Sequence, residues 1–232
     1  MDIALINSPV RGGVTDYINK LIAILPKEHV GTELIWQEDS TNAISEQTLA
    51  SDCLYLQYSG YGYAKRGAPL WLLRQLQTNR PQIKTLGIFF HELYAFGPPW
   101  GSAFWLSPIQ YHIARRLAEL SDFWITNREA SALWLRRFAN DKPHAVLPVF
   151  SNVGEMPVYS SNRSMKLVIF GGSALRLATY REAGGKLFSW AKRQGMEIHD
   201  IGPAINDKIV TERLVAENTI IHGRLAETEI SR

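Results

Sequence analysis

The chain of 232 residues is 46% hydrophobic and 20% charged, which is typical of a globular protein with one large or two small domains. Its formal net charge of +3 is mild and its basic residues are scattered, so we expect no nucleic acid as a partner. The sequence has neither a basic leader with an apolar stretch nor a run of about 20 apolar residues, which predicts a cytoplasmic protein. The single cysteine, Cys53, fits a reducing compartment, and we expect a buried thiol there.

The first 150 residues alternate between two hydrophobic patterns. Short apolar runs predict strands at residues 2–7, 32–36, 52–57, 84–90, 123–126 and 145–149. Apolar residues at helical spacing predict helices at residues 14–25, 68–77, 107–120 and 128–138. Ser107 with Pro108, and Asn127, are the predicted starts of the last two helices. This alternation is typical of a parallel sheet with helices on both faces, so residues 1–150 are predicted to form one α/β, doubly wound, Rossmann-like domain.

A second pattern begins after a break. Residues 151–164 are rich in Ser, Asn, Gly and Pro, which predicts a linker. Strands are then expected at 165–170, 196–201 and 219–221, helices at 177–194 and 209–216, and the first turns of a helix at 226–232. The 68 residues from Met165 to Arg232 fall short of a typical domain of about 100 to 150 residues. We therefore expect residues 165–232 to be the start of a second, incomplete Rossmann-like domain.

Two places in the first domain point to function. Gly12 and Gly13 stand between the first strand and the first helix, where paired glycines let a backbone approach a ligand and a helix start offers N–H groups to an anion. Plain turn chemistry is the alternative, since G-x-G-x-x-G is not present. His91 and Glu92 directly follow the strand at 84–90, at the edge where open α/β sheets bind ligands. A histidine that is merely packed at a strand end is the alternative for His91.

The runs LQYSGYGYAKRGAPLWLLRQL and LGIFFHELYAFGPPWGSAFWLSPIQYHIARRLAELSDFWITNREASALWL resemble the amino-terminal domain of glycosyltransferase family 4. The Gly12–Gly13 turn, the His91–Glu92 pair and the later run FGGSALRLATYR are similar to that family's landmarks. The resemblance implies the GT-B architecture, with an acceptor-side and a donor-side Rossmann-like domain. It also implies a retaining hexosyltransferase that uses a nucleotide-sugar donor and needs no cofactor and no obligatory metal. The acceptor would be a glycan or a lipid-linked glycan.

The resemblance also assigns residues. It implies that His91 is catalytic and lies close to the transferred sugar. It implies donor contacts at Gly12, Gly13, Gly172, Arg176 and Arg181, and acceptor contacts at Tyr58, Tyr61, Glu92 and Trp100. An arginine pair suits a diphosphate because a guanidinium binds phosphate oxygens in bidentate fashion. Ordinary exposure to solvent is the alternative for the two arginines.

One departure from the family puts activity in doubt, and other classes stay open. The family's Glu-x7-Glu motif does not occur after Met165, so we expect weak donor binding and a fragment or truncated form of a longer enzyme. The alternative function is a noncatalytic remnant that binds a glycan or lipid on Trp100, Phe104 and Trp105. With Lys65, Arg66, Arg115 and Arg116 these aromatic residues would also suit peripheral contact with an anionic membrane.

Hydrolase and metal-dependent chemistry fit the sequence less well. The run from Gly171 to Leu175 lacks the final glycine of the G-x-S-x-G nucleophile elbow of serine hydrolases. Asp-x-Asp does not occur, and the six histidines lack the spacing of metal ligands, so no metal site is predicted.

Overall fold

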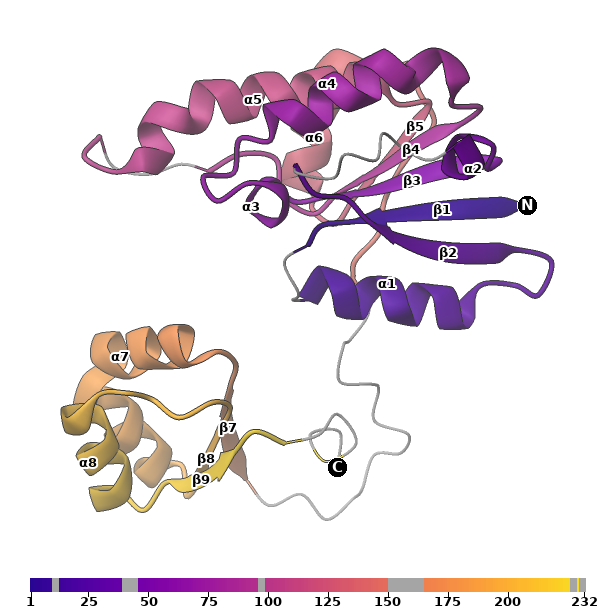
Figure 1. The fold of residues 1–232 in the computed structure, drawn as a ribbon. Coiled ribbons are helices and arrows are strands. Elements are labelled where there is room, and N and C mark those ends of the chain that lie inside the picture. Colours follow the sequence, from indigo (N-terminus) through magenta and orange to yellow (C-terminus); the bar gives the residue numbers. More distant parts are fainter. Residues whose placement is uncertain (10–12, 39–45, 96–98, 150–164, 226–228, 230–232) are drawn as a thin grey trace. The chain divides into compact units, whose positions relative to one another are not determined.

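The computed structural model describes residues 1–9, 13–38, 46–95, 99–149, 165–225 and 229. The chain divides into two compact units, Met1–Asn152 and Val153–Arg232, which are described here one at a time (Figure 1). The boundary between the units lies inside the predicted linker, whose own residues, 151–164, are outside the described part of the chain.

Unit 1 is built on a six-stranded parallel sheet. Its strands are β1 (Asp2–Asn7), β2 (Val30–Ile35), β3 (Cys53–Tyr58), β4 (Leu86–Phe90), β5 (Phe123–Thr126) and β6 (His144–Val146), in the order β2-β1-β3-β4-β5-β6. All five residues of the central strand β4 are buried. A parallel strand covered on both faces requires such a continuous apolar run, and this is the pattern that predicted it.

Helices cover both faces of this sheet. They are α1 (Gly13–Ile24), α2 (Glu46–Leu49), α3 (Gly60–Tyr63), α4 (Leu70–Asn79), α5 (Ser102–Leu120) and α6 (Glu129–Ala139), with a 3-10 turn at Arg80–Gln82. Helix α1 packs on one face with Leu5 and Phe89, whereas α4, α5 and α6 pack on the other face with Leu56, Ile88 and Phe90. Figure 1 shows α1 on one side of the sheet and α4 to α6 on the opposite side. Unit 1 is therefore doubly wound, as predicted.

Unit 2 contains a smaller parallel sheet. Strands β7 (Lys166–Phe170), β8 (Glu197–Ile201) and β9 (Ile220–Gly223) pair in that order, and helices α7 (Ser173–Arg193) and α8 (Lys208–Ala216) connect them. Tyr180, Phe188, Ile198, Val210 and Leu214 form its core. The α/β fold class is confirmed for both units. Of the predicted terminal helix at 226–232, only Glu229 lies among the described residues.

Several predicted helix starts were wrong. Helix α5 begins at Ser102 rather than Ser107, so Pro108 lies inside the helix instead of in its first turn. Helix α6 begins at Glu129, and Arg128, whose backbone is extended, occupies the N-cap position that was predicted for Asn127. Helix α7 begins at Ser173, four residues before the predicted start, and its Gly184 departs from helical dihedral angles. No helix among the described residues is both long enough and apolar enough to cross a membrane.

A buried ion pair holds unit 2 together at the carboxyl ends of β7 and β8. The Arg176 guanidinium donates to the Gly171 carbonyl oxygen (2.9 Å), to the Asp200 carboxylate and to the Pro203 carbonyl oxygen. The second carboxylate oxygen of Asp200 accepts a hydrogen bond from the Tyr180 hydroxyl at 2.7 Å. The side chains of Arg176 and Asp200 are only 2% and 3% exposed. Arg176 therefore ties two strand ends to each other, which corrects its predicted role as a ligand of the donor diphosphate.

The first prediction tests this ion pair. Arg176→Ala leaves the Asp200 carboxylate buried without its partner, and such a loss costs about 3–5 kcal/mol. Hydrogen exchange of the β7 and β8 amides should accelerate strongly while unit 1 is unaffected. Arg181→Ala is the matched control, because Arg181 lies on the same helix with its side chain 64% exposed. Equal protection of β7 and β8 in the two variants would contradict the assignment.

Candidate functional site

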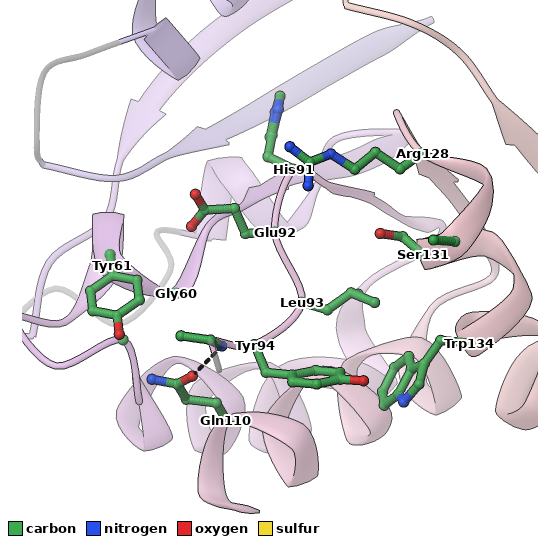
Figure 2. Close-up of a pocket in the computed structure, with 13 residues that line it drawn as sticks. Gly60, Tyr61, His91, Glu92, Leu93, Tyr94, Gln110, Arg128, Ser131 and Trp134 are labelled. Carbon is green, nitrogen blue, oxygen red and sulfur yellow. Dashed lines mark hydrogen bonds between the residues drawn. The ribbon is translucent and has the colours of Figure 1, made fainter. Parts of the chain in front are cut away.

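A cavity of about 490 Å³ opens at the carboxyl edge of the unit 1 sheet. Its walls come from the segments that follow β3, β4 and β5, which are adjacent in the sheet. Figure 2 shows the lining residues, which are Gly60, Tyr61, Gly67, His91, Glu92, Leu93, Tyr94, Ala95, Gln110, Arg128, Ala130, Ser131 and Trp134. Parallel strands bring their chain exits to one edge, so residues far apart in sequence gather there.

His91 lies at the α1 side of this edge. Its ring stacks on Phe89 with centroids 4.3 Å apart and meets the Tyr17 ring of α1 edge-on at 5.4 Å. Its Nε2 lies 2.9 Å from Oε1 of the buried Gln57. Burial lowers the pKa of His91 to about 4, so the imidazole is neutral near pH 7. With Gln57 Oε1 as acceptor, Nε2 carries the proton and Nδ1 is a hydrogen-bond acceptor.

Glu92 lies on the opposite side of the chain from His91. Its Oε2 accepts a hydrogen bond from the Ser59 hydroxyl at 3.0 Å. Figure 2 shows the His91 and Glu92 side chains leaving the loop in different directions, with Tyr61 on the Glu92 side of the cavity. Three predicted site residues therefore line the same cavity: His91, predicted to be catalytic, and Tyr61 and Glu92, predicted to contact the acceptor.

Tyr58 and Trp100 are placed differently. The Tyr58 ring is fully buried and packs against Phe90 with centroids 5.7 Å apart, so it belongs to the core. This corrects the prediction that it contacts the acceptor, because a side chain without solvent exposure has no surface to offer. Trp100 is 87% exposed but does not line the cavity.

Arg128 and Gln110 are site residues that the sequence reading missed. Figure 2 shows the Arg128 side chain extending from the start of α6 toward the loop that carries His91 and Glu92. The buried Gln110 of α5 fixes that loop, since its Oε1 accepts from the Ala95 N–H at 2.8 Å and its Nε2 donates to the Arg66 carbonyl oxygen at 3.0 Å. The available signal for Arg128 was its position two residues after a predicted strand.

The glycine turn of unit 1 is partly described. Gly12 lies outside the described residues, and Gly13 is the first residue of α1. A second cavity of about 340 Å³ lies close to this turn and is lined by Asn7, Ser8, Thr15 and Glu33 among others. The buried Asn7 amide donates to Glu33 Oε1 at 2.8 Å and to Thr15 Oγ1 at 3.2 Å. This polar cluster was not predicted.

The predicted donor residues of unit 2 do not form a pair. Gly172 is the N-cap residue of α7, and a Cβ atom there would meet nothing within 4 Å. Arg176 is buried as described above, whereas Arg181 is exposed and binds Asp207 at 2.5 Å. Arg181 lines a separate cavity of about 260 Å³ beside α8. Of the two predicted arginines, Arg181 is thus the one whose guanidinium reaches solvent.

Two other observations concern possible chemistry. Cys53 is buried as predicted, and burial raises the pKa of its thiol, which keeps it protonated. Among the residues that the structure describes, no group of three or more His, Cys, Asp or Glu side chains is arranged to hold a metal ion.

Comparisons with known proteins support the fold. No protein-family model matches the chain, and no curated protein matches its sequence. Among solved structures, that of S. aureus MnaA with UDP is 11% identical, with a TM-score of 0.54, and the match covers 99% of this chain and 70% of that chain. The fold is GT-B-like. AviGT4, a glycosyltransferase involved in avilamycin A biosynthesis, is 13% identical with a TM-score of 0.44, over 96% of this chain and 63% of that chain. At such identities the likeness concerns the fold alone, and membership of glycosyltransferase family 4 stays a prediction.

The second prediction concerns the buried imidazole. The pKa of His91 is about 4 in the folded chain, compared with about 6.5 when unfolded, so the unfolded state takes up its proton first as the pH falls. Above pH 6.5 the imidazole is neutral in both states and the protein keeps its full stability. As the pH falls from 6.5 to 4, the free energy of unfolding decreases by about 2–4 kcal/mol. Urea unfolding of the wild type and of His91→Asn should show this difference in pH dependence. Parallel pH profiles would mean that His91 titrates normally.

Proposed function

We propose that the chain acts as a retaining glycosyltransferase of the hexosyltransferase type, or as part of one, and that unit 1 binds the acceptor. The supporting observation is the cavity at the carboxyl edge of the sheet, where a carboxylate, a guanidinium and a neutral imidazole line one space. Pockets that combine apolar walls with a few convergent polar groups are the usual binding sites of small ligands.

The three polar residues suit different parts of this reaction. Glu92 is suited to accept a hydrogen bond from an acceptor hydroxyl, and the Arg128 guanidinium is suited to an anionic group such as a phosphate. Tyr94 and Trp134, whose ring centroids are 5.4 Å apart, offer an aromatic wall to the apolar face of a sugar ring. His91 contributes a neutral hydrogen-bonding group rather than a charge, because burial keeps the imidazole unprotonated.

We assign the nucleotide-sugar to unit 2. The support there is the open space around Gly171 and Gly172 at the start of α7, since helix starts bind phosphate through backbone N–H groups. Arg181 remains a candidate phosphate ligand and Arg176 does not. A uridine nucleotide is the first probe, because MnaA was solved with UDP. Breaking the sugar–phosphate bond places negative charge on the leaving diphosphate, and preorganised donors stabilise that charge.

A noncatalytic role is the second candidate. The exposed Trp100, Phe104 and Trp105 favour this role, because their rings offer apolar faces on which a glycan or lipid can be held without turnover. A chain that binds acceptor glycans in the unit 1 cavity but neither UDP nor any UDP-sugar would support this role instead of the transferase.

The third prediction tests His91 in transfer. Release of UDP from a panel of UDP-sugars, with and without glycan acceptors, should be lowered about 100-fold or more by His91→Asn, as is typical for loss of a transition-state hydrogen-bonding group. His112→Asn is the matched control, because His112 is exposed on α5. Equal turnover in both variants would remove His91 from the mechanism, and absence of UDP binding to the wild type would remove the transferase itself.

The fourth prediction concerns Arg128. Arg128→Met should raise KM for an anionic acceptor about 10-fold or more with little change in KM for the donor, because a charge-assisted hydrogen bond is lost on the acceptor side only. Arg137→Met provides the control, since Arg137 is exposed farther along the same helix. A rise in the donor KM instead would place the nucleotide, and not the acceptor, against Arg128.

A further inference from the structure

The amino-terminal end of α5 exposes large aromatic side chains. Trp100, just before the helix, is 87% exposed, and within the helix Trp105 is 70%, Phe104 43% and the aliphatic Ile109 38% exposed; we call these four residues the aromatic end of α5. The Phe104 and Trp105 rings contact each other edge-on with centroids 5.3 Å apart. Figure 1 shows this end of α5 reaching beyond the other elements of unit 1. Tryptophan is usually well buried, so two exposed tryptophans this close together indicate an interaction surface.

Basic side chains flank this aromatic end. Lys65 and Arg66 are exposed, and the Arg66 carbonyl oxygen is held by Gln110 of α5 at 3.0 Å. Gln110 directly follows Ile109 and lies about one and a half helical turns beyond Trp105. Helix α4, which packs beside α5, adds the exposed Arg74. The basic loop and the aromatic end are therefore neighbours on one side of unit 1.

The charge of this region is uneven, although the chain as a whole is only mildly basic. Residues 59–118 contain seven of the 25 Lys and Arg residues but only one of the 22 Asp and Glu residues. That single acidic residue is Glu92, which lines the cavity and binds Ser59. Four of the seven basic residues pair with acidic residues outside this range, Arg80 with Asp122, Lys84 with Asp52, and Arg115 and Arg116 with Glu119. The positive charge offered to a partner therefore comes from the exposed Lys65, Arg66 and Arg74.

We propose that the aromatic end of α5, together with Lys65 and Arg66, binds the surface of an anionic lipid bilayer. Tryptophan prefers the boundary between headgroups and acyl chains, and lysine and arginine next to it are attracted to anionic headgroups. The Trp105 indole N–H already donates to the Pro99 carbonyl oxygen at 2.8 Å. Its ring can therefore enter an apolar layer without leaving a hydrogen-bond donor unpaired.

The size of the surface favours a membrane over a protein partner. A stable protein interface buries about 800 Å² on each side and involves roughly 20–30 residues. The aromatic end of α5 consists of four residues at and just before one helix start, too few for such an interface. A few inserted aromatic anchors beside basic residues are sufficient for reversible attachment to a bilayer.

The surface also adjoins the candidate site. Tyr61, Gly67 and Gln110 line the cavity, and Gly67 directly follows the basic pair. A bilayer on this surface would lie beside the cavity, so an acceptor carried by a lipid would arrive next to Glu92 and Arg128. This last step rests on the proposed function, whereas attachment to the bilayer does not.

The fifth prediction tests attachment by co-sedimentation with vesicles, in the absence of any sugar nucleotide. The full chain should bind phosphatidylcholine vesicles that contain about one third phosphatidylglycerol, and bind vesicles of phosphatidylcholine alone much less, because the basic residues require anionic lipid. Trp100→Ala with Trp105→Ala should lower binding about 10-fold or more, since both anchors lose their apolar surface. Lys65→Glu with Arg66→Glu should remove the preference for anionic lipid.

Matched controls lie in unit 2. Trp190→Ala removes a tryptophan that is 42% exposed on α7, and Lys192→Glu with Arg193→Glu reverses an exposed basic pair; both should bind like the wild type. A second measurement uses Phe104→Cys with a polarity-sensitive fluorophore, because the native Cys53 is the one cysteine of the sequence and is buried. Its emission should shift to shorter wavelength on anionic vesicles.

Three results would overturn the proposal. The first is no binding of the wild type to anionic vesicles, and the second is binding that survives the loss of both tryptophans. The third is a Trp100→Ala, Trp105→Ala variant that binds vesicles like the wild type but has lost self-association or glycan binding. That result would identify a second copy of the chain or a sugar as the occupant. Failure of vesicle binding would leave the UDP-sugar experiments unaffected, so the two proposals fail separately.

Discussion

The candidate site depends on the burial of β4 between two layers of helices. Side chains of a strand alternate between the faces of a sheet, so Phe89 packs toward α1 and Phe90 packs toward α4 to α6. The next two residues continue this alternation past the end of the strand. His91 stacks on Phe89, and Glu92 leaves on the other side, where Ser59 binds it. One buried strand thus delivers an imidazole and a carboxylate to opposite sides of the same sheet edge.

The same packing sets the electrostatic character of the site. His91 has aromatic neighbours from β4 and α1 and one amide partner, Gln57, so its ring is shielded from water and burial lowers its pKa to about 4. Glu92 and Arg128 stand in the cavity, where a ligand can reach both. The charges available to a ligand are therefore on these two side chains, and the imidazole supplies hydrogen bonding without charge.

The sequence predicted the strands well because most of them are short apolar runs, such as β4, and the α/β class follows from their alternation with helices. Helix starts were harder. Ser107 followed by Pro108 has the form of an N-terminal cap, but the helix already begins five residues before Ser107, and no local pattern distinguishes the two cases. The exposure of individual side chains was the hardest property to predict, because it depends on residues that are distant in the sequence. Arg176 and Arg181 are five residues apart in the same helix. Arg176 is buried and pairs with the buried Asp200, whereas Arg181 is exposed and pairs with Asp207. Tyr58 likewise ends in the core because Phe90 of the neighbouring strand packs on it.

The exposure of the aromatic end of α5 follows from the lengths of the elements. A helix of 19 residues is about 28 Å long, whereas a five-residue strand such as β4 spans about 17 Å. The helix must return the chain from the carboxyl end of β4 to the start of β5, so its excess length extends past one end of the sheet. The buried residues Gln110, Ile113, Ala114 and Leu117 fix the later turns on the sheet, which leaves the excess at the amino-terminal end. Phe104 and Trp105 stand on these unsupported turns, at the edge where the cavity opens. The length of α5 therefore brings the exposed aromatic residues and the candidate site to the same end of unit 1.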